Sequence, residues 1–438
     1  MESAALTSEA SGARRVLPEA WALGAWAGLI AACWAVGTAL NEAGSPMLLG
    51  APPLFGGWDV QLGPEILAPS AVAGAIVVGG PAVARHAPWS VLLVASVLAL
   101  AAWSVALALT DGVGGLTGPL EGRPEYLSVV PVLDSPGEFL STFLERADDY
   151  PTHVRAHPPG MALILLWLDG AGLGGSGVAA ALMIATGATA PAAALVAMRA
   201  VAGESAARRA APFLVLIPAA VYVATTADAL YMGVGAWAVA AIVVGTVGDG
   251  RRADVMAALG GLLFGVVLFL SYGLALLGAI PLAVAVARRR FRRLALAAAG
   301  VAAVILAFLA AGFWWLDGLL EVREQYNASV ARNRAYEYFV FNNLAAFALV
   351  VGPAVAIALA RLRDRRVWLL AGGGLASVLL ADLSGMSKAE VERIWLAFVP
   401  WVALAACALP ARGWAPRALL AGQALVAIAI ESGVETLW

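Results

Sequence analysis

The sequence is poor in charged residues. Only 13% of its 438 residues are charged, whereas 62% are hydrophobic, and the mean hydropathy is +0.86. Soluble domains carry about a quarter of their residues as charged side chains, so this shortage excludes an ordinary soluble protein. Apolar runs able to cross a hydrocarbon core of roughly 30 Å recur along the chain. We therefore expect an all-α fold, a polytopic transmembrane helical bundle embedded in a lipid bilayer.

Cysteine and lysine are nearly absent. Cys33 and Cys407 lie inside apolar runs, where cysteine behaves as a small hydrophobe rather than as half of a disulfide or metal site. Lys388 is the single lysine, and the net charge of −2 gives no indication of a nucleic-acid partner. The Ala-, Gly- and Arg-rich composition is typical of GC-rich bacterial genomes, so we expect a bacterial plasma membrane protein.

The apolar segments predict about 13 spans. They lie near residues 21–40, 65–84, 88–110, 159–200, 210–227, 229–248, 254–271, 273–287, 294–315, 341–360, 367–382, 394–410 and 417–432. Arg14 and Arg15 precede the first span and place the N-terminus in the cytoplasm by the positive-inside rule. Residues 1–18 are expected to form a disordered cytoplasmic tail, and residues 19–438 a single transmembrane domain.

The distribution of charge separates two sets of loops. Short arginine-rich loops fall on the cytoplasmic side, whereas residues 111–158 carry eight acidic residues against three arginines. We expect 111–158 to be a large extracytoplasmic loop and 316–340 a second one. Residues 159–200 must then cross the membrane an odd number of times. Because a Gly-rich break lies at 170–177, we predict a half-helix or re-entrant helix over 159–168 and one full span over 178–199.

The acidic loop holds the first candidate for chemistry. Its part DSPGEFLSTFLERADDYPTHVRAHPPG, residues 134–160, predicts a short amphipathic helix over 137–147 that lies in the membrane interface. Asp134 precedes this helix, and a carboxylate close to apolar walls can act as a general base. The alternative is that Asp134 caps the helix.

Two histidines follow at a spacing of four residues. On a helix, His153 and His157 would share one face, and with Asp148 and Asp149 nearby a divalent metal site is conceivable, although two prolines argue against a regular helix. We expect these histidines to contact a substrate or a phosphate, and we assign no metal ligand. A structural role is the remaining alternative.

Further charged residues lie at the extracytoplasmic ends of predicted spans. Asp228 sits at a tight turn, where a carboxylate close to the hydrocarbon indicates function unless it only caps the turn. Lys388 and Arg393 could together hold a lipid-linked phosphate, although Glu390 and Arg393 are also spaced for a salt bridge. In the 316–340 loop, Arg332 and Arg334 suit phosphate, whereas the neighbouring tyrosines suit either sugar stacking or interfacial anchoring.

This pattern resembles the GT-C superfamily of polytopic glycosyltransferases. An outer-loop Asp134, a short interfacial helix and His157-Pro158-Pro159-Gly160 leading into a span are similar to the arrangement in protein O-mannosyltransferases and aminoarabinose transferases. The stretch SGMSKAEVERIW is similar to one in actinobacterial members. The resemblance implies an outer layer of short interfacial helices over the bundle.

The resemblance also implies a function. Such enzymes move a sugar from a polyprenyl-phosphate donor to a glycan, lipid or protein acceptor on the extracytoplasmic face, in cell-envelope assembly. Asp134 would then be the catalytic base. Substrate binding would fall to the residues His153, His157, Asp228, Arg332, Arg334, Lys388, Glu390 and Arg393. A transporter or lipid flippase is the main alternative, because broken helices with charges at membrane depth also suit transport, and a scaffold protein is a further one.

Overall fold

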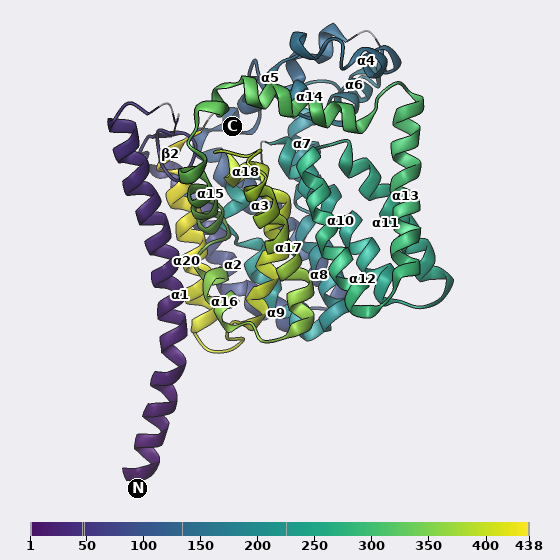
Figure 1. The fold of residues 1–438 in the computed structure, drawn as a ribbon. Coiled ribbons are helices and arrows are strands. Elements are labelled where there is room, and N and C mark those ends of the chain that lie inside the picture. Colours follow the sequence, from purple (N-terminus) through teal and green to yellow (C-terminus); the bar gives the residue numbers. More distant parts are fainter. Residues whose placement is uncertain (1, 46, 48, 134, 225, 437–438) are drawn as a thin grey trace.

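The chain folds into an all-α bundle with one very small sheet. The structure is a computed structural model that describes residues 2–45, 47, 49–133, 135–224 and 226–436 (Figure 1). In these residues the sheet consists of β1 (Gly57–Trp58) and β2 (Val434–Glu435), which pair antiparallel and tie the first long loop to the C-terminal segment. The expected all-α membrane bundle is confirmed at this level.

The chain consists mainly of α-helices, with short 3-10 helices between some of them. The α-helices are α1 (Glu2–Glu42), α2 (Leu67–His86), α3 (Trp89–Ala108), α4 (Pro136–Thr142), α5 (Thr152–Arg155), α6 (Gly160–Gly170), α7 (Ser176–Gly187), α8 (Ala190–Ala202), α9 (Glu204–Val215), α10 (Ala227–Val247), α11 (Gly250–Leu268), α12 (Ala279–Arg288), α13 (Phe291–Ala310), α14 (Trp315–Ala328), α15 (Tyr336–Val351), α16 (Pro353–Arg361), α17 (Arg365–Leu383), α18 (Val391–Ile394), α19 (Val399–Ala403) and α20 (Ala415–Glu431). The 3-10 helices include η5 (Tyr126–Ser128), η8 (Pro218–Tyr222), η9 (Tyr272–Gly278), η10 (Val330–Asn333), η11 (Leu396–Phe398) and η12 (Leu404–Ala408).

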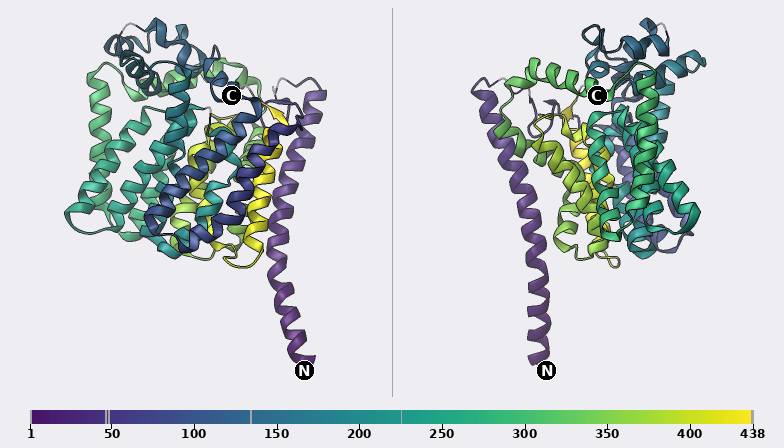
Figure 2. Two further views of the ribbon diagram at one scale, coloured as in Figure 1. Left: turned by 180° about the vertical axis from the view of Figure 1, so that it is seen from behind. Right: turned by 45° about the vertical axis from the view of Figure 1, so that its right-hand side comes forward.

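Within the described residues, seven helical segments are long and apolar enough to cross a membrane, or up to eight if one bent pair counts as a span. The seven are Pro18–Glu42, Pro64–His86, Trp89–Asp111, Ser176–Ala202, Ala227–Val247, Phe291–Ala310 and Arg365–Leu383. Shorter apolar helices lie at Gly160–Gly170, Tyr272–Arg288 and Leu396–Ala408. The chain is thus a multi-pass membrane protein, but the expected 13 spans are not confirmed. The first span lies on the outside of the bundle as part of α1 (Figure 2), and disorder in residues 1–18 stays a prediction.

The predicted span over 341–360 is instead two helices bent by 96°. Gly352 separates α15 from α16 with a φ of +84°, which favours glycine, and Pro353 has no N–H with which to continue the helix. Gln423 of α20 compensates for the break. Its Nε2 donates to the Val351 carbonyl at 2.9 Å, and its Oε1 accepts from the Ala354 N–H at 3.1 Å. The helix pair is therefore bent at a site where its freed backbone groups are satisfied.

The region 159–200 contains one short helix and one long span, as predicted from its Gly-rich break and the charges of the loops on either side. A short apolar helix, α6, is followed after a Gly-rich turn by the span Ser176–Ala202, which is built from α7 and α8. Gly160, at the start of α6, donates its N–H to the Phe269 carbonyl at 2.8 Å. A Cβ at Gly160 would lie 2.3 Å from that oxygen, so only glycine permits this close approach.

The arginine-rich loops gather at one end of the bundle. Arg208 donates to the Ala84 and Ala87 carbonyls, which end α2, and Arg85 donates to the Ala411 carbonyl. Figure 1 shows this end at the bottom, near α9, α12 and α16. The helices α4, α5, α6, α14 and α18 lie at the opposite end, at the top. Positive charge and the acidic loop therefore occupy opposite ends of the molecule.

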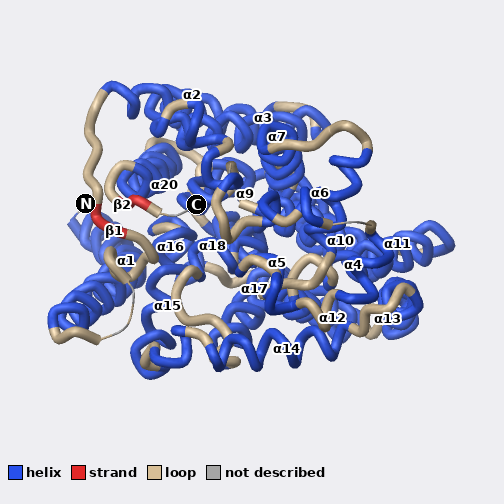
Figure 3. Tube along the Cα trace, turned by 90° about the horizontal axis from the view of Figure 1, so that it is seen from above, coloured by secondary structure: helices blue, strands red, loops and turns tan. Residues whose placement is uncertain are grey.

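A layer of short helices covers the acidic end. In α4, the Ser135 hydroxyl caps the helix by accepting from the Glu138 N–H at 3.2 Å. Phe139 and Phe143 are buried, and the ring of Phe143 stacks on Tyr150 with centroids 5.5 Å apart. The segment expected as the 316–340 loop forms α14 and η10, and α14 runs along one edge of this end (Figure 3).

Candidate functional site

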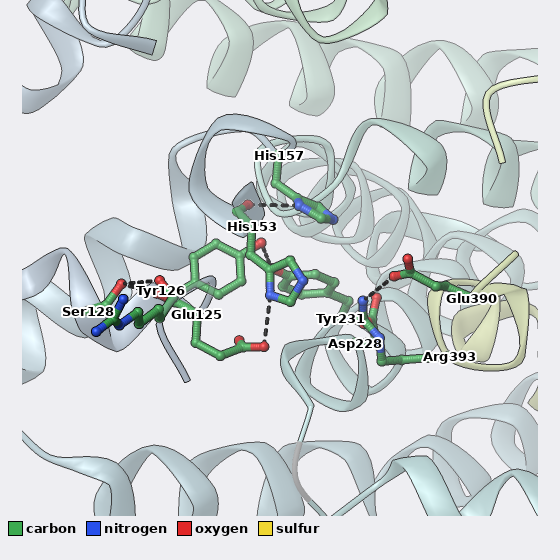
Figure 4. A network of polar contacts seen from close by, with 10 residues as sticks. Glu125, Tyr126, Ser128, His153, His157, Asp228, Tyr231, Glu390 and Arg393 are labelled. Atoms are coloured by element: carbon green, nitrogen blue, oxygen red, sulfur yellow. Dashed lines mark hydrogen bonds and ion pairs between the residues drawn. The ribbon is translucent and has the colours of Figure 1, made fainter. Parts of the chain in front are cut away.

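Five of the predicted site residues lie together at the acidic end. His153, His157, Asp228 and Arg393 line one small cavity, and Glu390 contacts Arg393 from its edge (Figure 4). The other residues that line the cavity are Glu125, Tyr126, Thr226, Ala227 and Tyr231. They come from three parts of the chain that are distant in sequence: the acidic loop, the start of α10 and the segment before η11.

The centre of the cavity wall is an ion pair. Arg393 Nη1 lies 2.7 Å from Asp228 Oδ2, and the two side chains are only 6% and 8% exposed. Arg393 Nη2 also lies 3.2 Å from Glu390 Oε2, so the i,i+3 salt bridge considered from the sequence is present. Because two carboxylates share one guanidinium in a buried place, the arginine is held in one position with its charge intact.

The loop that carries Arg393 is shaped by Asn343 of α15. Ala389 and Glu390 both have positive φ values, +73° and +62°, a conformation that non-glycine residues rarely adopt. Asn343 Nδ2 donates to the Ser387 carbonyl at 2.8 Å, while its Oδ1 accepts from the Ala389 N–H at 3.3 Å. A buried amide thus stabilises the turn that directs Arg393 toward Asp228.

His153 pairs with a carboxylate. Its Nδ1 lies 2.8 Å from Glu125 Oε1, and each side chain is 12% exposed. The backbone ties the same two segments together, because the His153 N–H donates to the Pro124 carbonyl at 3.0 Å. The ring of Tyr126 lies beside the imidazole, with centroids 6.2 Å apart.

His157 is a neutral neighbour. Its Nδ1 lies 2.9 Å from the His153 carbonyl, and its ring is edge-on to Tyr126 at 6.0 Å. Burial, with a smaller contribution from His153, lowers the pKa of His157 to about 3. The Tyr231 hydroxyl donates to the Tyr126 hydroxyl at 2.9 Å and completes the aromatic side of the cavity.

Glu392, next to Arg393, is almost fully buried. Its Oε1 accepts from the Phe55 N–H at 2.7 Å, which joins this segment to the first long loop. Burial, together with the charge of Glu390, raises the pKa of the Glu392 carboxyl to about 7. It therefore titrates near neutral pH.

Three of the predicted basic residues belong to a different group of contacts. Arg334 is buried, contacts the Lys388 carbonyl and lies over the rings of Phe55 and Phe339. Lys388 Nζ donates to the Ala331 carbonyl at 3.2 Å, and Arg332 is exposed. None of the three lines the cavity with Arg393. Lys388 and Arg393, which could together hold a lipid-linked phosphate, lie in separate groups of contacts, and Asp134 lies outside the described residues.

Sequence reasoning missed Glu125, Tyr126 and Tyr231. Glu125 was one of eight acidic residues in its loop, and nothing local singled it out. Tyr231 could have been identified as a site residue from the sequence, because it follows Asp228 by three residues and so shares its helix face. Tyr126 could not have been identified from the sequence, because its position depends on the folding of the whole loop.

The cavity is small. It leaves room for about one water molecule between its side chains. Among the residues that the structure describes, no three His, Cys, Asp or Glu side chains are grouped so as to hold a metal ion. Comparison of this chain with protein families, curated proteins and solved structures finds no match.

Proposed function

We propose that this protein is a GT-C-type membrane glycosyltransferase. It moves a sugar from a polyprenyl-phosphate donor to an acceptor on the extracytoplasmic face of a bacterial plasma membrane, in cell-envelope glycan assembly. The observation that carries this proposal is the convergence of the Asp228–Arg393 pair and the Glu125–His153 pair on one cavity at the acidic end. A fixed cation beside a group able to accept a proton is what glycosyl transfer from a phosphate requires.

Arg393 is the group that would bind the donor phosphate. As the sugar leaves, negative charge builds up on the phosphate oxygens, and a guanidinium that is already ordered stabilises that charge without reorganising. Asp228 and Glu390 hold the guanidinium by one nitrogen each. Asp134, which the sequence predicts as the base, lies outside the described residues, so its role is not part of this geometry.

The position of the buried charges favours a transferase over a transporter. Among the described residues, the buried Asp, Glu and Arg side chains are Asp228, Arg293, Arg334, Asp382, Glu392 and Arg393. Each lies in the first or last turn of a helix or in a connecting segment. A transporter is expected to place its substrate site near the bilayer midplane, with charges in the middle of its spans.

Donor binding requires movement of the site. The closed cavity has no space for a sugar phosphate. The segment that carries Arg393 and the acidic loop contribute separate walls, so displacing either one opens the cavity. Loop closure over a bound substrate is a common way to exclude water from a reactive intermediate.

The reaction product tests the proposal. Purified protein in liposomes is given a panel of polyprenyl-phosphate hexoses and pentoses together with cell-envelope glycan acceptors. A transferase releases free polyprenyl phosphate and leaves the sugar on the acceptor, and the double variant Asp228→Asn/Arg393→Gln abolishes both products. Movement of intact donor between the leaflets, without cleavage, would contradict the proposal and support the flippase.

A further inference from the structure

We propose that His153, oriented by Glu125, accepts the proton of the acceptor hydroxyl. This inference rests on the proposed function and names the base of the same site. It differs from the prediction made from the sequence, which gave that role to Asp134.

The contact between His153 and Glu125 fixes the tautomer of the imidazole. With Nδ1 lying 2.8 Å from Glu125 Oε1, the Nδ1–H donates to the carboxylate, and the lone pair is left on Nε2. Figure 4 shows the ring edge opposite Glu125 turned toward Asp228 and Arg393. The proton-accepting nitrogen therefore faces the place proposed for the donor phosphate.

The pair is positioned rigidly. His153 lies in the single turn of α5, which follows Pro151, and its N–H is bound to the Pro124 carbonyl next to Glu125. Both side chains are 12% exposed, so the imidazole is shielded from bulk water but still opens into the cavity. Because side chain and backbone both tie His153 to the segment of Glu125, the ring needs little reorientation relative to its partner when a hydroxyl binds.

The other titratable groups that face His153 are less suited to this role. His157 is held at Nδ1 by the His153 carbonyl, and its lowered pKa of about 3 makes it a weak base. Asp228 is occupied by Arg393. Burial raises the pKa of Tyr126 well above its usual value, so its hydroxyl stays protonated. Arg393 is a cation, and among these neighbours only Glu125 pairs directly with the His153 ring.

Transfer of the sugar from the donor phosphate to the acceptor oxygen is a single displacement at the anomeric carbon. The acceptor oxygen forms a bond to the anomeric carbon while its proton moves to His153 Nε2. The bond between the anomeric carbon and the phosphate oxygen breaks, and its electron pair leaves with the polyprenyl phosphate beside Arg393. Glu125 stabilises the imidazolium that forms, as the carboxylate partner of a catalytic histidine does in other enzymes.

Four variants in liposomes test this assignment. His153→Gln is expected to lower kcat by about 10²- to 10⁴-fold, and Glu125→Gln by a smaller factor, with KM for the donor nearly unchanged. His86→Gln, at the arginine-rich end, and Glu145→Gln, an exposed carboxylate of the same loop, are the matched controls and should retain wild-type kcat.

One further readout separates a chemical role of His153 from a structural one. Added imidazole should restore at least about 10-fold of the activity lost in His153→Gly, because it supplies the missing base without restoring the fold.

Some results would contradict the assignment of His153 as the base. Full activity in His153→Gln overturns the assignment. A loss in Glu125→Gln that exceeds the loss in His153→Gln also overturns it, because the Glu125 carboxylate would then be the base. A loss in Asp134→Asn with no loss in His153→Gln returns the role to Asp134. These outcomes leave sugar transfer itself intact, whereas absence of transfer by the wild-type protein with every donor overturns both proposals.

Discussion

Asp228 and Arg393 are in direct contact, with Oδ2 and Nη1 2.7 Å apart, although 165 residues separate them in the sequence. Both side chains are buried, so removing Arg393 leaves the charge of Asp228 uncompensated, which typically costs 3–5 kcal/mol. The contact joins the start of α10 to the segment that holds α18. Formation of the cavity is therefore coupled to the docking of these two parts of the bundle.

The charge segregation of the bundle predicts its orientation. In a background with Cys33→Ala and Cys407→Ala, Ser128→Cys at the acidic end should react with a membrane-impermeant maleimide in intact cells. Arg412→Cys, at the arginine-rich end, should react only after permeabilisation, because both positions are exposed but on opposite ends. The reverse labelling pattern would place the cavity in the cytoplasm and remove the basis for an extracytoplasmic donor.

The bend between α15 and α16 depends on Gln423. Gln423→Leu leaves the Ala354 N–H and the Val351 carbonyl without their partner, and we expect a loss of roughly 2–4 kcal/mol in the free energy of unfolding. Denaturant unfolding in detergent micelles measures this loss. Gln61→Leu, on an exposed loop, is the control and should change stability by less than about 0.5 kcal/mol. Equal stability of the two variants would mean that the amide does not support the bend.

Glu392 gives the folded protein a pH-dependent stability. Its pKa rises from 4.5 to about 7 on burial, so between these values the folded chain holds a proton that the unfolded chain has released. The free energy of unfolding should therefore fall as pH rises from about 4.5 to 7, by up to about 3 kcal/mol, and level off above that range.

Glu392→Gln isolates this effect. The amide oxygen can still accept from the Phe55 N–H, and the variant cannot ionise, so its stability should lose most of that slope and exceed the wild-type value at pH 8. Glu324→Gln, an exposed carboxylate, should keep the wild-type slope. Thermal unfolding at pH 5, 6, 7 and 8 gives the comparison, and an unchanged slope in Glu392→Gln would assign the effect to other groups.

Much of the fold could be predicted from hydropathy and charge. The break after α6 and the span Ser176–Ala202 followed from two features: the charges of the flanking loops restrict the number of crossings, and the Gly-rich stretch 170–177 places the break. The segments near 341–360 and 394–410 were each predicted as one span, but the first is bent by 96° and the second is a shorter apolar helix over Leu396–Ala408. An apolar run has the same composition whether it is straight or broken, and the partner that permits the break, such as Gln423, is distant in sequence.

The sequence predicts those site residues whose polar side chains lie beside apolar segments, where burying a charge is costly. Asp228, Arg393 and the two histidines stood out because polar side chains next to apolar spans need a reason to be there. Their partners were not predictable in the same way. Glu125 reaches His153 only after the loop between them has folded, and the backbone of the 384–390 turn directs Lys388 toward Ala331 instead of toward Arg393. Such contacts depend on tertiary structure rather than on local pattern.

The most direct test of the central claim is the rate at which free polyprenyl phosphate is released from a polyprenyl-phosphate sugar by Arg393→Gln in liposomes. Arg363→Gln, an exposed arginine at the opposite end, is the matched control and should release it at the wild-type rate. We expect Arg393→Gln to release polyprenyl phosphate at least about 10²-fold more slowly than the wild-type protein, because the leaving phosphate loses the cation that stabilises it. Release at the wild-type rate by a folded Arg393→Gln protein would contradict the proposal that this cavity holds the donor phosphate.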